Sequence, residues 1–240
     1  MSLMITEQLF LKDSYLKECE GKVLMCEFTD LTVDRTVFFP TMDGQQNDKG
    51  EIVIDGKTFG IVDVWTDGDY IHLISLDTYP DNTVGKTIQQ KLDWDVRNIH
   101  MRFRTAMFII SGLAYKFYNA KSRISQTYDD KAWVDLYIDN ITEDIVKNIM
   151  EEANKIVKQN IPIKIEYLNS NDFPREKQRM SYSTGTLPDD EKLRVINISG
   201  LPLQADYGLY TASTGEVGEI EIASSMVKGK IDKRLTITLK

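Results

Sequence analysis

The sequence predicts an α+β fold in which a small, barrel-like β-domain precedes a larger α+β domain. Two observations lead to this prediction. The first ninety residues contain short runs of β-branched and aromatic residues separated by turn signals. From about Trp94 onward, apolar residues recur every three or four positions, and later segments alternate between apolar and polar. The predicted domains cover residues 1–90 and 91–240.

Five short runs in the first domain read as strands. Asp55-Gly56, between the third and fourth run, predicts a two-residue hairpin, and Asp67-Gly68 predicts a second turn. Strands at this spacing are typical of a small barrel or sandwich. The runs are VLMCEF (23–28), RTVFF (35–39), EIVI (51–54), TFGIVDVW (58–65) and YIHLISL (70–76).

A long helix is expected to begin near Trp94. Next to its apolar face, His100, Arg104 and Phe108 form a row of residues four positions apart. Side chains on such a row point the same way and can converge on one site. The apolar face itself consists of Ile99, Phe103, Ala106, Ile110, Leu113 and Phe117.

A second helix is expected from Thr142, which suits a helix N-cap, to a point before Pro162. We expect its inward face to carry Ile145, Ile149, Ala153 and Ile156. Four alternating segments then predict strands at 161–168, 193–199, 219–223 and 235–239. The polar, turn-rich segment 171–192 is expected to be a mobile loop.

The formal net charge of −8 argues against broad nucleic-acid binding, because proteins that grip many phosphates usually show a basic surface. A local contact with one strand end stays open. Two segments suggest basic patches, although solvated surface charge is the plainer interpretation. They contain Arg175, Lys177 and Arg179, and Lys228, Lys230, Lys233 and Arg234.

No segment resembles a signal peptide or a membrane span, so we expect a cytoplasmic protein. Cys19 and Cys26 are expected to be reduced thiols in that compartment. Only two histidines are present, so any metal site would consist mostly of carboxylates.

Four stretches together resemble the free-standing alanyl-tRNA editing proteins of the AlaX type and the editing domain of alanyl-tRNA synthetase. Their order and spacing agree with the family across essentially the whole chain. They are DRTVFFPTMDGQQNDKG (34–50), LDWDVRNIHMRFRTAMFIISG (92–112), KLRVINISGLPLQ (192–204) and DYGLYTASTGEVG (206–218).

The resemblance implies a C-terminal editing domain that hydrolyses serine or glycine from the tRNA that should carry alanine, with the tRNA acceptor end as partner. It also implies zinc, held by an HxxxH pair and a CxxxH pair. This sequence departs from that pattern at all four ligand positions, which are Arg104, Phe108, Asp206 and Tyr210. Because arginine and phenylalanine cannot ligate zinc, we predict that this cofactor is absent.

The replacements suggest that Arg104 and Asp206 pair, while Phe108 and Tyr210 fill the remaining volume. Arg104, Asp206 and Tyr210 are therefore the candidate catalytic residues. Thr36, Gly44, Gln45 and His100 are the candidate substrate-binding residues, since the resemblance places a serine-sensing hydroxyl at Thr36 and the end of a glycine-rich motif at Gln45. That loop is altered, with Met42 and Asp43 where the family has glycines.

Two functions stay open at this point. One is an aminoacyl-tRNA ester hydrolase, a trans-editing deacylase, that works without zinc. The other is a non-catalytic module on the same fold that binds an aminoacyl-tRNA, a small molecule or a protein. The residues leave the oligomeric state undetermined, and fold by itself does not decide between these functions.

Overall fold

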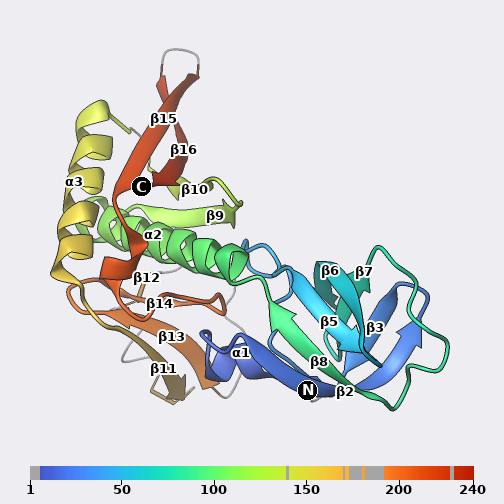
Figure 1. Cartoon of the computed structure of the whole chain (residues 1–240). Coiled ribbons are helices and arrows are strands. Elements are labelled where there is room, and N and C mark those ends of the chain that lie inside the picture. Colours follow the sequence, from blue (N-terminus) through green and yellow to red (C-terminus); the bar gives the residue numbers. More distant parts are fainter. Residues whose placement is uncertain (1–5, 139–140, 170, 173–179, 182–191, 228–229) are drawn as a thin grey trace. The chain divides into compact units, whose positions relative to one another are not determined.

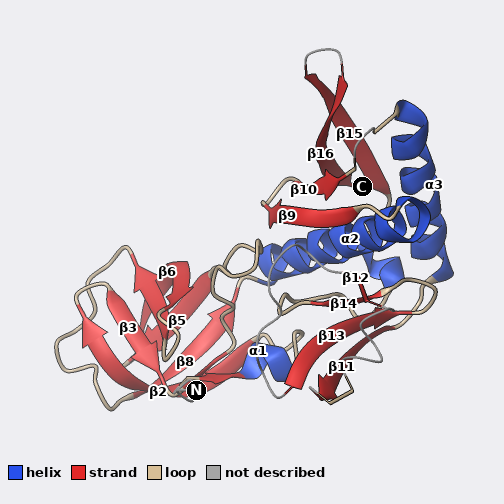
Figure 2. Ribbon diagram, turned by 180° about the vertical axis from the view of Figure 1, so that it is seen from behind, coloured by secondary structure: helices blue, strands red, loops and turns tan. Residues whose placement is uncertain are grey.

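A computed structural model of the chain describes residues 6–138, 141–169, 171–172, 180–181, 192–227 and 230–240 (Figures 1 and 2). The chain divides into two compact units, residues Met1–Ile99 and His100–Lys240. The first unit is dominated by a closed barrel, and the second combines helices with two sheets. The predicted mixed α+β class with a small barrel domain is confirmed.

Six strands close the barrel of the first unit in the order β2-β3-β7-β6-β5-β8. Closure pairs every strand edge, so none is left to recruit another chain. The strands are β2 (Glu18–Glu27), β3 (Asp30–Val33), β5 (Gly50–Ile54), β6 (Lys57–Thr66), β7 (Ile71–Ser75) and β8 (Thr87–Leu92). Two short strands, β1 (Glu7–Gln8) and β4 (Arg35–Thr36), pair in parallel beside it, and α1 (Leu9–Lys12) follows β1.

The predicted hairpin at Asp55-Gly56 connects β5 to β6. Both residues have positive φ, 51° and 79°, as a two-residue type I′ turn requires. Residue 90, where the sequence pattern puts the first domain's end, lies within β8.

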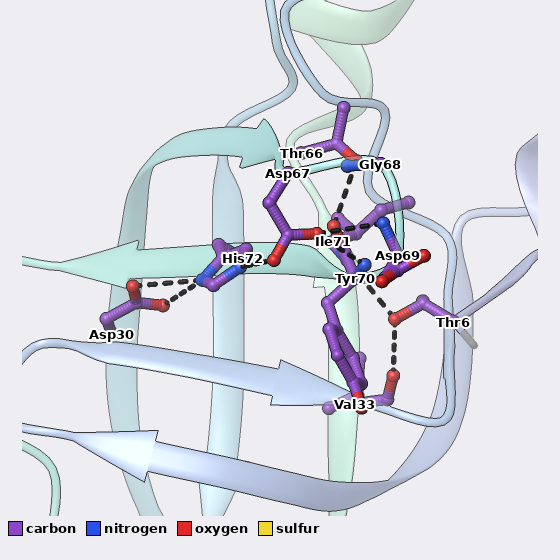
Figure 3. Close-up of polar contacts among 10 residues, drawn as sticks. All are labelled: Thr6, Asp30, Val33, Thr66, Asp67, Gly68, Asp69, Tyr70, Ile71 and His72. Carbon is purple, nitrogen blue, oxygen red and sulfur yellow. Dashed lines mark hydrogen bonds and ion pairs between the residues drawn. The ribbon is translucent and has the colours of Figure 1, made fainter. Parts of the chain in front are cut away.

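Figure 3 shows the turn between β6 and β7, which polar groups hold in place. One carboxylate oxygen of Asp67 accepts hydrogen bonds from the backbone N–H groups of Asp69 (2.9 Å) and Tyr70 (2.8 Å). The hydroxyl of Thr66 accepts from the N–H of Gly68 at 3.1 Å. Aspartate and threonine favour turns because their side chains can satisfy nearby backbone donors in this way.

His72 is held against the outside of the same barrel (Figure 3). Its Nδ1 lies 3.0 Å from both carboxylate oxygens of Asp30 on β3. Close by, the hydroxyl of Thr6 donates to the carbonyl of Val33 at 2.7 Å and accepts from the N–H of Ile71 at 3.2 Å. These contacts tie the segment before β1 to two barrel strands.

The long helix α2 (Trp94–Tyr118) lies between two sheets of the second unit, as Figure 1 shows. Apart from Arg102, its residues from Met101 to Ala114 are buried, so the helix is packed on all sides. On one side the carbonyl of Phe108 accepts from Gln204 Nε2 (3.0 Å), and on the other His100 bonds Asp129. The predicted helix is therefore present and central.

The first of these sheets has the strand order β15-β16-β10-β9 and the second has the order β11-β13-β14-β12. In the first, the strands are β9 (Lys121–Thr127), β10 (Ala132–Tyr137), β15 (Ile220–Val227) and β16 (Lys230–Leu239). In the second, they are β11 (Ile163–Asn169), β12 (Met180–Ser181), β13 (Lys192–Ile198) and β14 (Leu203–Ala205). All four strands predicted in this half are confirmed, within one or two residues at most ends.

Helix α3 (Glu143–Gln159) begins and ends where the sequence predicts. Thr142 caps it by accepting a hydrogen bond from the N–H of Ile145 at 3.3 Å. Asn160 closes it in the left-handed conformation, with φ 49°. Asn154 then exchanges two hydrogen bonds with the backbone of Ile220 on β15, which joins the helix to the first sheet. The short 3₁₀ helix η2 (Thr214–Val217) follows the loop after β14.

Several sequence expectations differ from the structure. The buried face of α3 carries Val146, Ile149, Ala153 and Val157, so of the expected inward residues Ile149 and Ala153 are buried, whereas Ile145 and Ile156 lie at its margin and are half-buried. Phe117 is 44% exposed, because it lies in the last turn of α2 beyond the packed layers. Residues 37–39 of RTVFF are buried but form no strand; the N–H groups of Phe38 and Phe39 bond to the side chains of Thr36 and Asp48 instead. The hairpin of β9 and β10 was not predicted.

Most of the predicted mobile loop, 171–192, lies outside the described residues, and with it Arg175, Lys177 and Arg179. Lys228 also lies outside them. No helix within the described ranges is both long enough and apolar enough to cross a membrane.

Candidate functional site

Arg104 and Asp206, which are 102 positions apart in the sequence, form a bidentate ion pair. The Nε of Arg104 donates to Asp206 Oδ2 at 2.9 Å, and its second nitrogen, Nη2, donates to Oδ1. The Arg104 side chain is 8% exposed and that of Asp206 is 13% exposed. Helix α2 supplies the arginine, and the loop after β14 supplies the aspartate. The predicted pairing of these two residues is confirmed.

Asp206 receives two further hydrogen bonds on Oδ2. The hydroxyl of Tyr210 donates to it, and so does the backbone N–H of Gly208 at 3.1 Å. The Tyr210 ring in turn packs edge-on against Phe108, with ring centroids 5.3 Å apart. The residues at the four positions where the family has zinc ligands, 104, 108, 206 and 210, thus form one cluster, as predicted from the sequence.

The charges of this cluster follow from its contacts. Burial disfavours ionised Asp206, but the positive charge and hydrogen bonds of Arg104 outweigh it and lower the pKa of that carboxyl below its ordinary value. Burial, reinforced by the negative charge of Asp206, raises the pKa of the Tyr210 phenol well above its ordinary value. At neutral pH the cluster therefore holds a guanidinium, a carboxylate and a neutral phenol.

A second buried guanidinium adjoins the cluster. Arg194 on β13 is 1% exposed, and it donates to the backbone carbonyl oxygen of Asp206 at 2.5 Å. Its Nε–H has no hydrogen-bond partner among the residues that the structure describes. Arg104 bonds the Asp206 carboxylate and Arg194 bonds the backbone carbonyl of the same residue, so the described side chains of the cluster carry two guanidinium charges and one carboxylate charge. Sequence reasoning missed Arg194, although it stands in the quoted stretch KLRVINISGLPLQ.

The loop that carries Asp206 is anchored to α2 one residue after Arg104. The hydroxyl of Thr105 accepts the backbone N–H of Thr211 at 3.2 Å and lies 3.1 Å from the Thr211 hydroxyl. Both threonines are buried. These contacts keep the loop with Asp206 next to the helix with Arg104, and no motif or spacing in the sequence indicates them.

His100 belongs to the same row of α2, and its hydrogen bond runs to the turn between β9 and β10. Its Nε2 lies 3.0 Å from Asp129 Oδ1, with the imidazole 1% exposed and the Asp129 side chain 56% exposed. A carboxylate beside an imidazole fixes the ring's orientation. The role of His100 in substrate binding remains a prediction.

The remaining candidate residues belong to the first unit. Thr36 is buried, and its hydroxyl donates to Gln90 Oε1 at 2.6 Å and accepts from the N–H of Phe38. Gln45 is also buried and closes a turn by exchanging backbone hydrogen bonds with Met42. Their proposed contact with substrate stays a prediction.

The altered loop keeps a backbone conformation suited to glycine. Between Met42 and Gln45, Asp43 has φ 52° and Gly44 has φ 78°, as in a type I′ turn. Aspartate tolerates this left-handed region better than most side chains. The loop therefore forms a turn of the type that glycine favours, although Asp43 brings a side chain to it.

A fully buried pair anchors the same loop. Arg97 donates through Nε to Asp48 Oδ1 at 2.8 Å, and its other nitrogens donate to the carbonyls of Ser14 (2.7 Å) and Val37 (2.6 Å). Asp48 also accepts the N–H of Phe39 at 2.6 Å. Both residues lie inside the quoted motifs, which is the only sequence signal that could have identified them.

The amino-acid sequence of the chain is similar to those of known proteins. It is 33% identical over 98% of its length to the alanyl-tRNA editing protein AlaX-M of Saccharolobus solfataricus and covers all of that protein. This chain belongs to the alanyl-tRNA editing proteins.

Other relatives agree with that assignment. The AlaX-M protein of Methanosarcina acetivorans is 29% identical, and the match covers 98% of this chain and 99% of that protein. The alanine–tRNA ligase of Ignicoccus hospitalis is 28% identical over 92% of this chain, which corresponds to 24% of the ligase. No family model matches the chain.

The zinc that the alanyl-tRNA editing resemblance implies does not fit the residues present. Arg104 has no lone pair to offer, Phe108 has no donor atom, and Tyr210 has a raised phenol pKa and donates its proton to Asp206. The Asp206 carboxylate already accepts four hydrogen bonds. Because zinc requires three or four nitrogen, sulfur or oxygen ligands, this donor set is unsuitable.

Proposed function

We propose that the chain acts on the aminoacyl end of the tRNA for alanine and hydrolyses the ester of a wrongly attached serine or glycine without zinc. Similarity to alanyl-tRNA editing proteins over 98% of the chain supports the substrate class. The observation that carries the chemistry is the excess positive charge of Arg104 and Arg194 around Asp206. A buried organic cation here takes over the electrostatic role of a metal ion.

Ester hydrolysis adds water to the carbonyl carbon and then breaks its bond to the ribose oxygen, which leaves with a proton. Negative charge develops on the carbonyl oxygen on the way, and fixed positive donors stabilise that charge. In our proposal Arg104 polarises the carbonyl, and Arg194 adds to the positive field. Asp206 is ionised because of Arg104, so it can orient the water or hold the amino group of the substrate.

One observation favours a second function, that of a non-catalytic module for the same aminoacyl end. The Arg104–Asp206 pair is closed, and the carboxylate has donors on both oxygens. For either residue to meet a substrate, at least one of these bonds must be exchanged. A site that binds the aminoacyl end without hydrolysing it would not need Asp206 to give up one of these hydrogen bonds.

Deacylation of seryl- and glycyl-tRNA for alanine tests the two functions, with and without a chelator and alongside metal analysis of the purified protein. Hydrolysis that the chelator leaves unchanged and that R104M and R194M each reduce supports the proposal. An unchanged rate in both variants contradicts it. Tight binding of the charged tRNA without turnover establishes the second function, and chelator-sensitive turnover overturns the metal-free site.

A further inference from the structure

The first sheet of the second unit has one buried face and one open face. On β10, Ala132, Val134 and Leu136 are buried, whereas Trp133, Asp135 and Tyr137 alternate with them and are at least partly exposed. On β16, Leu235 and Ile237 are buried in the same alternating pattern. Because successive side chains of a strand point to opposite faces, the second set faces away from the core.

Register places further side chains on this open face. Ile124 of β9 and Arg234 of β16 both pair with Asp135, and Lys121 pairs with Tyr137. Cross-strand partners share a face. Ile124 is 54% exposed and Tyr137 is 43% exposed, so the face offers apolar and aromatic surface to a partner.

Two arginines lie against aromatic rings there. Arg234 Cζ is 3.6 Å from the centroid of the Trp133 ring, and the guanidinium bonds both oxygens of Asp135 at 2.7 and 2.9 Å. The guanidinium is therefore held over the indole ring. Arg123 Cζ lies 5.9 Å from the centroid of the Tyr137 ring, which brings a second guanidinium to this face.

The charge of this face is opposite to that of the protein. On β9, β10 and β16, the described cations Lys121, Arg123 and Arg234 outnumber the one carboxylate, Asp135, although the chain has a formal net charge of −8. On the neighbouring β15, Glu221 lies on the same face and forms an ion pair with Lys240, so this pair adds no net charge. Open aromatic rings, guanidinium planes and excess cations are the three features that bind RNA: bases stack on the first two, and the third meets phosphates. A basic protein partner would be repelled by the cations.

We propose that the open face of β16, β10 and β9, formed by Lys121, Arg123, Ile124, Trp133, Tyr137 and Arg234, is an RNA-binding platform. Since it rests on the proposed function, the RNA is the tRNA itself. Bases stack on Tyr137 and on the Arg234–Trp133 pair, and Lys121 and Arg123 contact phosphates. The basic tail residue Arg234, singled out from the sequence, thereby receives a role.

Binding of uncharged tRNA for alanine to the full-length protein tests this platform. Fluorescence anisotropy at two or more salt concentrations gives the dissociation constant and its salt dependence. We expect Y137A and R123A each to weaken binding about tenfold. R123A should also lower the slope of log K against log salt by about one, because one phosphate contact is lost.

Two variants in the first unit are matched controls. Trp65 is 40% exposed and stacks on the ring of His72, and Lys57 lies 4.7 Å from the centroid of the Phe59 ring. W65A and K57A remove the same kinds of group elsewhere and are expected to bind tRNA as the wild type does. Unchanged thermal unfolding of Y137A and R123A shows that the fold is intact.

Wild-type affinity in Y137A and R123A, or an absence of tRNA binding by the wild type, overturns the platform. The deacylation assay decides the proposed function separately. If the wild type hydrolyses seryl-tRNA while Y137A and R123A bind normally, the platform is wrong and the function stands. If tRNA binding depends on Tyr137 and Arg123 but no ester is cleaved, the platform stands and hydrolysis does not.

Discussion

Replacement of Arg104 by methionine should destabilise the second unit strongly. The variant keeps an unbranched side chain, shorter than that of arginine, but removes the cation. Among the described residues, the buried Asp206 carboxylate then keeps donors from Gly208 and Tyr210 alone. Removing one partner of a buried ion pair typically costs about 3–5 kcal/mol. The side chains here are 8% and 13% exposed and two donors remain, so we expect a loss of about 3 kcal/mol.

Urea unfolding at pH 7 measures this loss, with Trp133 reporting on the second unit after Trp65 and Trp94 are replaced by phenylalanine. The surface pair Arg234–Asp135 is the matched control, because it is bidentate as well but its side chains are 43% and 19% exposed. R234M should cost at most about 1 kcal/mol. The double variant R104M/D206N should lose less than the two single variants together, since neither charge is then left unpaired.

The dependence on pH gives a second, independent readout. In the wild type the folded pKa of Asp206 lies below the unfolded value, so its contribution is present above pH 3.8 and is lost as the pH falls through the folded pKa. In R104M the charge and hydrogen bonds of Arg104 are lost, so burial is opposed only by the weaker effects of Tyr210 and Arg194, and the folded pKa of Asp206 rises from its wild-type position. Less of the stabilisation that is present above pH 3.8 then remains in R104M than in the wild type. Lowering the pH should therefore reduce the difference in the free energy of unfolding between R104M and the wild type. The buried ion pair is refuted if R104M loses no more unfolding free energy than R234M does and its difference from the wild type does not change with pH.

Three further predictions follow from the described contacts. The variant R104H/F108H/D206C/Y210H restores the ligand set that the family resemblance implies. It should bind about one equivalent of zinc by metal analysis, because residues 104 and 108 are one helical turn apart. Substoichiometric zinc would contradict the equivalence of these four positions to the family's ligand positions. G56A should cost about 1 kcal/mol in urea unfolding, since Gly56 has φ 79° and a Cβ there meets no atom within 4 Å, whereas G60A, equally open but without positive φ, should cost nothing. Burial raises the pKa of the Cys19 thiol to about 11, so its alkylation rate should increase with pH through about 11; a midpoint near 9 would show that the thiol is exposed.

Much of the fold can be predicted from local patterns. Alternation and turn residues identify the barrel strands, as at Asp55-Gly56, and a period of three to four residues identifies α2 and α3. The prediction failed where local preference and packing diverge. Polar strand β9 has no apolar alternation to mark it, and Phe117 extends the apolar pattern of α2 past the layers that cover it.

The candidate site divides in the same way. Side-chain chemistry alone excludes Arg104 and Phe108 as zinc ligands, so that conclusion needs no coordinates. Whether Arg104 meets Asp206, and whether Arg194 adds a second cation, depends on where α2, β13 and the loop after β14 come together. Helix α2 is about a hundred residues from the other two segments along the chain, and no local pattern encodes contacts over such a separation. Tertiary packing alone decides whether these residues meet, because the energies of burial and pairing depend on which residues are neighbours in space.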